Sequence, residues 1–488
     1  MGFCMQGQND TQQQLFHTVE LDSFIPNSHL LKKVNRLIDF NFIYDLTKPL
    51  YCDNNGRPSV DSVLFFRMQL IGYLYNIQSD RRLCEEIHLN IAYRWFCGLN
   101  LDDKIPNHSS ITRIRDRFGT GTYEKIFNTL LDQWRSQGIV KGKRVISDAS
   151  MVEANAAMDS LVERDNDDPD LTPLKRYQHR YHDFKEGKRQ RKVSNQTHVS
   201  YTDPDATMVS HKNLHKKLQY KVHYTIDAQS RMILDCYGTT GSKHECNVLP
   251  ERVDYLVKQR DFSIEEIIAD KGYGRGPSYT AFREYGIRNY IPLHDDNLGQ
   301  GKLSRGNFKY DRRNDRYRCP KGHYLYPYDK LEKNLLKRYR VTGGHCLQCP
   351  LRDSCLPNNM QHRARFVYRS PHQDEIDKVR KRQSTPTFKK RLTERKWKVE
   401  GLFGEAKENH CLRRVKYRGL AKAQIQFFMI ALAQNVKRRV INGKKYFILQ
   451  GIIQLPTHII ELAPKAILET ISKESLLSRE KESAALVA

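Results

Sequence analysis

Four short β-rich segments after Gly138 constrain the fold of this chain most strongly. They cover residues 144–147, 217–226, 232–237 and 264–269. A connection of hairpin length joins the second segment to the third, whereas residues 247–260, before the fourth, have apolar positions at helical spacing. The predicted order is strand, strand, strand, helix, strand, which indicates an α/β fold built on a mixed sheet flanked by helices.

The rest of the chain predicts further parts around this sheet. Helical spacing of apolar residues recurs at 62–75, at 81–89 and over a long run at 388–440. A further strand is expected at 288–292. We therefore predict an N-terminal helical domain at 1–137, a first core segment at 138–293 with a charged insert at 159–210, a basic cysteine-containing subdomain at 294–387, a last core segment at 388–445 and a tail at 446–488.

The charge of the chain points to a polyanionic partner. It carries 82 Lys and Arg against 56 Asp and Glu, a formal net charge of +26, which is more than solubility requires. Nucleic acid is the expected partner. Within the charged insert, residues 165–170 are acidic and 175–192 are basic, so this segment is either a grip on phosphates or a charged loop without a fixed partner.

One predicted helix is a candidate for DNA contact. It opens at residues 108–110, where Ser109 or Ser110 can cap it, and it then presents Arg113, Arg115 and Arg117. A basic but merely solvated face is the alternative. The longest apolar stretch of the chain is too short to span a bilayer, so we expect a cytoplasmic protein without membrane contact.

Two aspartates follow predicted strands. Asp148 ends the first strand and Asp270 follows the apolar run of the fourth, just before a tight turn. If these strands are neighbours in one sheet, the two carboxylates meet at its edge. Each residue alone could equally be a turn or cap residue. Asp203 and Asp205 are the rivals for the second position, but they precede the second strand.

A third carboxylate, Glu400, lies on the predicted helix that contains Thr393 to Lys407. At 100° per residue, Thr393, Lys396, Glu400 and Lys407 share one face. Three neighbours, Glu394, Glu405 and Glu408, point elsewhere and are expected to be solvated, whereas Trp397 and Phe403 are expected to face the core.

Three carboxylates of this kind suit phosphoryl transfer. Hard oxygen ligands prefer Mg²⁺ or Mn²⁺, and two such ions about 4 Å apart can activate the attacking group and stabilise the leaving oxygen. Lys396 and Lys407 can bring positive charge to DNA phosphates beside the site, although both can also be ordinary helix-surface lysines. His244, at a predicted helix start, is a weaker candidate for DNA contact.

Four cysteines in the basic subdomain have spacing that suggests metal binding. Cys346, Cys349 and Cys355 follow Cys319, and His323 lies four residues after Cys319. Four thiols can close a structural Zn²⁺ site. Reduced, unliganded cysteines are the alternative, because only one half of the motif is a regular C-x2-C pair.

Several motifs, in this order, resemble the bacterial insertion-sequence transposases of the DDE type. They are RPSVDSVLFFRMQLIGYLY, NHSSITRIRDRF, VISDASMVEANA, IIADKGYG and VEGLFGEAKENHCLRRVKYRGLAKAQIQ. The resemblance implies a ribonuclease-H-like core whose catalytic metal ligands are Asp148, Asp270 and Glu400. It also implies Mg²⁺ or Mn²⁺, binding of terminal inverted repeats and target DNA, a homodimeric complex, 3′-end cleavage and strand transfer.

Basic residues within these motifs, or just before the last of them, are candidate DNA contacts. They are Lys271, Lys396, Lys407, Arg414, Arg113 and Arg117. In the family's C-terminal pattern of Tyr, Arg, Glu and Lys, this chain has Thr393 and Lys396 in the first two places, which affects how flanking DNA is held. An inactive DNA-binding derivative and a nuclease that cuts without joining are the alternative functions.

Overall fold

The computed structural model describes most of the chain and divides it into two compact units. The described residues are 20–52, 59–164, 193–210, 216–294, 303–331, 336–356 and 364–453. One unit comprises Met1–Ile126 with Val436–Ala488, and the other comprises Phe127–Asn435. The charged stretches at 165–170 and 175–192 and the tail beyond residue 453 lie outside the described residues.

The described N-terminal part of the first unit is helical. Its helices are α1 (Leu21–Phe24), α2 (Leu30–Leu37), α3 (Phe42–Thr47), α4 (Ser62–Leu74), α5 (Asp80–Leu89), α6 (Ile91–Cys97) and the start of α7 (His108–Ser136). The helices predicted at 62–75 and 81–89 are present as α4 and α5. The predicted serine cap of α7 is wrong, because the Asn107 side chain accepts the hydrogen bond from the Ser109 N–H.

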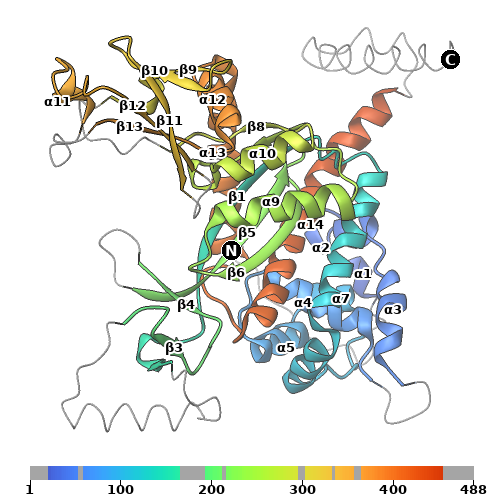
Figure 1. Ribbon diagram of the computed structural model, residues 1–488. Helices are drawn as coiled ribbons and strands as arrows, with labels where there is room; N and C mark the ends of the chain where they lie inside the picture. The colour runs from blue at the N-terminus through green and yellow to red at the C-terminus, as the bar shows by residue number, and fades with distance from the viewer. Residues whose placement is uncertain are drawn as a thin grey trace, which may run out of the picture. The chain divides into compact units, whose positions relative to one another are not determined.

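The second unit contains a six-stranded mixed sheet, shown in Figure 1. Its strands are β1 (Arg144–Glu153), β4 (Thr207–Val209), β5 (Lys217–Asp227), β6 (Ile233–Thr240), β7 (Glu266–Ile268) and β8 (Arg288–Tyr290). The strand order is β4-β5-β1-β7-β8, and β6 also pairs with β5. Strand β5 is antiparallel to β1 and β6, whereas β1, β7 and β8 are parallel. This confirms the predicted mixed sheet of a ribonuclease-H-like α/β fold.

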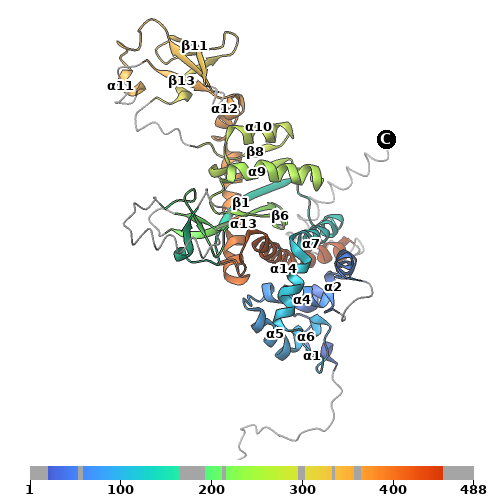
Figure 2. The same cartoon turned by 60° about the horizontal axis from the view of Figure 1, so that its bottom comes forward.

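Helices cover both faces of this sheet, as Figure 2 shows. Helix α9 (Glu245–Asp254) is followed by a π-helical turn at Tyr255–Gln259. It packs on one face, where Arg252 forms an ion pair with Asp235 of β6 at 2.6 Å. Helix α13 (Pro386–Asn409) packs on the other, where Phe403 stacks on Tyr224 at 4.8 Å between ring centroids. Helix α10 (Gly276–Glu284) lies next to α9 and β8.

The single helical run predicted at 388–440 is two helices. Helix α13 ends at Asn409, and α14 (Leu420–Ile453) begins after a loop. Within that loop Cys411 has a positive φ of 63°, and Val415 donates its N–H to the Glu153 carbonyl at the end of β1. The loop therefore pairs with the end of β1, and helical spacing in the sequence does not reveal this pairing.

Helix α14 is bonded to β6 through buried amide side chains. Asn435 accepts from the Ile233 N–H at 2.7 Å and donates to the Ile233 carbonyl at 2.8 Å. Gln424 makes the same kind of pair with the Gly238 N–H and the Cys236 carbonyl. These bonds satisfy backbone groups on the free side of an edge strand.

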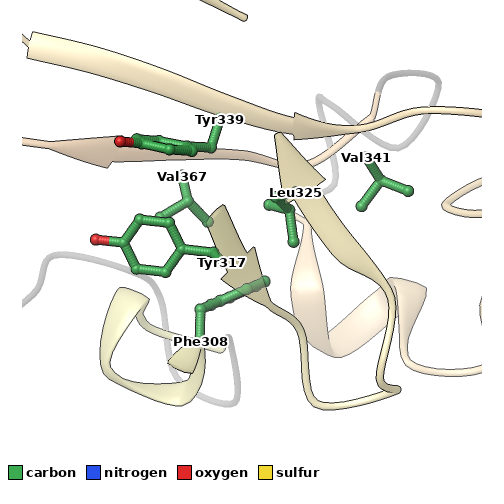
Figure 3. Packing of buried hydrophobic residues seen from close by; sticks show 6 residues of the cluster. All are labelled: Phe308, Tyr317, Leu325, Tyr339, Val341 and Val367. Carbon is green, nitrogen blue, oxygen red and sulfur yellow. The ribbon is translucent and has the colours of Figure 1, made fainter. Parts of the chain in front are cut away.

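Residues 303–369 form a second, five-stranded antiparallel sheet, which the sequence suggested only as an inserted region. Its strands are β9 (Lys309–Asp311), β10 (Arg316–Arg318), β11 (Tyr324–Leu331), β12 (Leu336–Val341) and β13 (Phe366–Arg369), in the order β13-β12-β11-β10-β9. Figure 3 shows the small core on one face of it, built from Phe308, Tyr317, Leu325, Tyr339, Val341 and Val367.

Smaller elements complete the second unit. Strands β2 (Leu161–Glu163) and β3 (His198–Ser200) pair with each other. In the sequence, α11 (Arg352–Cys355) precedes β13 and α12 (Gln373–Arg382) follows it. Among the described residues, no helix is long and apolar enough to cross a membrane.

The amide pair on β6 predicts a specific loss of stability. Asn435 is fully buried, so Asn435→Ala leaves two backbone groups of Ile233 without partners, each at a cost of about 1–3 kcal/mol. We expect faster hydrogen exchange at the Ile233 amide and a lower urea midpoint. Asn409→Ala, at an exposed position, is the control and should change neither. Equal exchange in both variants would contradict this role of Asn435.

Candidate active site

Asp148 and Asp270 lie side by side where the parallel pairing of β1 with β7 ends. The prediction that Asp148 ends the first strand is wrong, because β1 continues to Glu153 and pairs Asp148 with Tyr224 of β5. The register pairs Ile146 with Ile268. Two residues further along the same register, Asp148 lies next to Asp270, whose charge raises the pKa of the Asp148 carboxyl. Asp270 also accepts from the Gly272 N–H at 2.8 Å, so it caps the turn η4 (Lys271–Tyr273) as well.

The Asp148 carboxylate is largely removed from water. Its side chain is 15% exposed, and burial raises its pKa to about 6, with further upward contributions from Asp270 and Glu245. Arg395 opposes this effect by forming an ion pair with Asp148 at 2.7 Å. The net upward shift of the pKa therefore comes first from loss of contact with water, and the charges of Asp270 and Glu245 each add less than Arg395 removes.

Glu245 is an acidic neighbour that the sequence reasoning missed. It is the first residue of α9, and its charge raises the pKa of Asp148 and of the buried Tyr273. A Cβ atom on Gly272 would lie 2.8 Å from Glu245 Oε2 and 3.0 Å from Asp270 Oδ1, so these two carboxylates share one small space. Lys221 on β5 forms an ion pair with Glu245 at 3.2 Å. The only sequence signal was an acidic residue in a helix's first turn.

Arg395 is the second residue that the sequence reasoning missed. The spacing pattern directed attention to Lys396, yet it is Arg395 on α13 that reaches Asp148. Its side chain is 13% exposed. This ion pair fixes the helix that carries Glu400 against strand β1.

Glu400 occupies a different side of α13. It lies five residues after Arg395, or about 140° around the helix axis, and it is exposed, as are Thr393 and Lys396. Lys407 is half-buried, and burial lowers its pKa. The structure thus brings Asp148 and Asp270 together and leaves Glu400 on the solvent side of a helix that contacts the same strand.

Two predictions about this helix are wrong. Glu394 is not a solvated charge: its side chain is 14% exposed and forms ion pairs with Arg144 at 3.2 Å and with Lys398. Trp397 does not face the core, because 58% of it is exposed, where it stacks with the Arg231 guanidinium. Phe403 is buried as expected.

The rival aspartates have other partners. Asp203 is fully buried and accepts from the Tyr220 hydroxyl and, at 3.1 Å, from the Gly419 N–H. Asp205 accepts from the Leu420 N–H at 2.8 Å. Both therefore cap the start of α14.

The candidate DNA contacts are mostly exposed. Lys271 lies in η4, directly after Asp270, whereas Arg414 lies beside the far end of β1, where it donates to Asn155 at 3.4 Å. On α7 in the first unit, Arg113 and Arg117 are exposed, whereas Arg115 is buried in an ion pair with Asp80 at 2.6 Å. His244 is exposed immediately before α9.

The four clustered cysteines converge in the second unit. Cys319, Cys346, Cys349 and Cys355 line one cavity of about 30 Å³ together with His323 and His345. The two imidazole rings stack at 4.6 Å. As the side chains lie, no group of three or more His, Cys, Asp or Glu residues in the described ranges is arranged to hold a metal ion, at this cavity or at the aspartates.

Two segments match known protein families. Residues 19–117 match the model described as Transposase domain (DUF772), and residues 318–440 match the model described as Transposase DDE domain. No curated protein matches significantly. The second match contains Glu400, and it begins after both candidate aspartates.

Solved structures with remote similarity are transposase complexes. One is a piggyBac transposase synaptic complex with hairpin DNA, which is 11% identical to this chain. The similar region covers 91% of this chain and 84% of the piggyBac chain, with a TM-score of 0.34. A Mos1 transposase paired-end complex is 10% identical over 49% of this chain and 61% of its own, with a TM-score of 0.16. The fold assignment rests on the strand order of the sheet itself.

Burial of Asp148 predicts a pH-dependent stability. A pKa raised from 3.8 to about 6 means that the folded state binds the proton more tightly, so stability falls as the pH rises toward 6 and stays lower above it. Asp148→Asn mimics the protonated form. In metal-free buffer it should raise the unfolding free energy by up to about 3 kcal/mol at pH 8, and by less at pH 5. An equal effect at both pH values in urea titrations would contradict this account.

Proposed function

We propose that this chain, a DDE-type transposase by its two family matches, binds the terminal inverted repeats of an insertion sequence, cleaves their 3′ ends and joins them to target DNA. The observation that carries the proposal is the side-by-side position of Asp148 and Asp270, where the parallel pairing of β1 and β7 ends. Holding two partly buried carboxylates side by side costs free energy, which a bound cation would offset.

The donor set fits a hard divalent cation. Asp148 and Asp270 supply carboxylate oxygens, and Glu245 adds negative charge beside them. Asp148, Asp270 and Glu400 would hold two Mg²⁺ or Mn²⁺ ions. When bound, these ions activate a water or a 3′-hydroxyl and stabilise the leaving oxygen of an in-line displacement.

The side chains of the protein prepare this site in two ways. Arg395 balances the Asp148 charge in the ion pair at 2.7 Å, and it must release one carboxylate oxygen when a cation binds. Gly272 leaves room for the carboxylates of Asp270 and Glu245. We propose that Glu400, now exposed, joins the two aspartates when DNA binds along α13, and that Glu245 positions Asp270.

Basic residues, all of them exposed except the half-buried Lys407, would supply the DNA contacts. Lys271, Lys396, Lys407 and Arg414 lie on the elements that carry or follow the three carboxylates, and Arg113 and Arg117 lie on α7. Their positive charge offsets the repulsion between DNA phosphates and the acidic site. We propose that two copies of the chain act together on the paired element ends.

Carboxylate substitutions test the catalytic proposal. Asp148→Asn, Asp270→Asn and Glu400→Gln should reduce cleavage of labelled element-end DNA with Mg²⁺ to background while leaving DNA binding intact. Glu245→Gln should retain cleavage but require about 10–100-fold more metal, since a residue that positions a ligand acts through metal affinity. Gel assays at graded Mn²⁺ concentrations measure both effects.

A matched control and three outcomes make this test decisive. Glu408→Gln, an exposed glutamate on the same helix that is ion-paired with Arg413, should cleave like wild type. Cleavage surviving in all three catalytic variants would refute the site. Nicked but never joined products would favour a nuclease, and DNA binding without wild-type cleavage would favour an inactive derivative. Loss of cleavage in Glu245→Gln but not in Glu400→Gln would mean that Glu245, and not Glu400, is the third metal ligand.

We also propose that the cysteine cavity takes up a structural Zn²⁺. The four thiols line one cavity, and burial raises the pKa of Cys355, with smaller upward contributions from the other three thiols and an opposing one from Arg365. Such mutual repulsion is relieved by a cation. To ligate Zn²⁺, the four thiols must move closer together. Positive φ angles at Gly343 and Gly344 mark a tight turn just before Cys346.

Metal content tests the zinc proposal. Protein produced with zinc should hold about one equivalent by elemental analysis, and Cys346→Ser with Cys349→Ser should lose it, because a four-thiolate site fails with two ligands. Cys52→Ser, an exposed cysteine in the other unit, should keep it. Wild-type protein without zinc would refute the site, and chelation should speed hydrogen exchange in residues 303–356 only if zinc is bound.

A further inference from the structure

The five-stranded sheet has two different faces. One face carries the small core of Figure 3. Because side chains alternate along a strand, the register places basic and aromatic residues opposite it: Tyr326 pairs with Arg340, Arg338 with Tyr368, and Arg340 with Phe366. We call this second surface the tyrosine–arginine face. It comprises Arg316, Arg318, Tyr324, Tyr326, Tyr328, Arg338, Arg340, Phe366 and Tyr368.

Three tyrosines on this face are unusually accessible. Tyr326 is 43% exposed, Tyr328 53% and Tyr368 43%. A β-bulge between Pro327 and Asp329 turns Tyr328 outward, where its ring lies edge-on to Phe366 at 5.7 Å. Exposed rings on a rigid sheet form a platform on which planar groups can stack.

Arginines hold these rings in place. The Arg340 guanidinium lies 4.5 Å from the Tyr328 ring centroid, and the Arg316 guanidinium lies 3.8 Å from that of Tyr324. The Arg338 guanidinium lies 5.4 Å from the Phe366 ring. The platform is therefore ordered before any partner arrives, which reduces the entropy cost of binding.

The charge of the face is positive after its ion pairs are counted. Arg316 pairs with Asp311 at 3.0 Å, and Arg338 pairs with Asp329. Arg318 and Arg340 form no ion pair with any described residue. Two guanidinium groups thus remain available for anions beside three accessible aromatic rings.

We propose that the tyrosine–arginine face binds a single DNA strand, with unpaired bases stacked on Tyr326, Tyr328 and Tyr368 and phosphates held by Arg318 and Arg340. Aromatic rings interleaved with cationic side chains suit a strand whose base faces are open. Duplex DNA hides those faces in its own stack. The face lies away from the carboxylates in sequence, so this binding does not depend on the proposed catalysis.

The test compares bases with bare backbone on the full-length protein. The probes are a fluorescein-labelled oligothymidine of about 12 nucleotides and an abasic strand of equal length. Replacing all three tyrosines, Tyr326→Ala, Tyr328→Ala and Tyr368→Ala, should weaken oligothymidine binding at least tenfold in fluorescence anisotropy and leave the abasic strand unaffected. Arg318→Ala with Arg340→Ala should weaken both and lower the salt dependence.

Controls separate stacking from folding and from other basic surfaces. The corresponding Tyr→Phe triple variant should bind like wild type, and Tyr201→Ala, at another exposed tyrosine, should also do so. Strands containing 5-iododeoxyuridine should photo-crosslink to peptides carrying Tyr326, Tyr328 or Tyr368. Equal loss for the abasic strand, stronger binding of duplex DNA through the same residues, or crosslinks only elsewhere would overturn the proposal. Asp148→Asn leaves this binding unchanged, so the two proposals fail separately.

Discussion

The parallel pairing of β1 with β7 is the constraint on which the candidate site depends. Residues 148 and 270 are 122 positions apart in sequence, and only the register that joins Ile146 to Ile268 makes them neighbours. Parallel strands need a long crossover connection, which here includes β5, β6 and α9. The same connection places the first residue of α9, Glu245, at the edge where the two aspartates lie.

Concentrating negative charge at a sheet edge is costly, and the structure shows how the protein offsets it. Arg395 neutralises Asp148 from α13, and Lys221 neutralises Glu245 from β5. Burial nevertheless raises the pKa of Asp148 to about 6, and this shift is due first to desolvation and only then to the charges of Asp270 and Glu245. Carboxylate oxygens in such a partly desolvated site suit a hard divalent cation.

The sequence predicted most of the mixed sheet, because strand composition and the hairpin between β5 and β6 are local signals. It also identified Asp148 and Asp270 as neighbours, because their strands pair; however, only Asp270 follows its strand, whereas Asp148 lies within β1. It could not predict Arg395, since spacing alone favoured its neighbour Lys396, and it missed Glu245, whose position depends on how α9 packs. Trp397 and Glu394 were misassigned because α13 is rich in basic residues. Its few apolar positions define poorly which side of the helix is buried.

The second sheet illustrates a further limit of sequence patterns. In β11 tyrosines occupy alternate positions, and in β12 arginines flank Tyr339, yet Tyr339 is buried and Tyr326 is exposed. Tyrosine suits both environments, so alternation alone does not reveal which face is the core; the cross-strand register does, by opposing Leu325 to Val341 and Tyr326 to Arg340. The six core residues of this sheet lie on only one of its two faces. The other face is therefore free to carry guanidinium groups and rings, a composition that stability does not require.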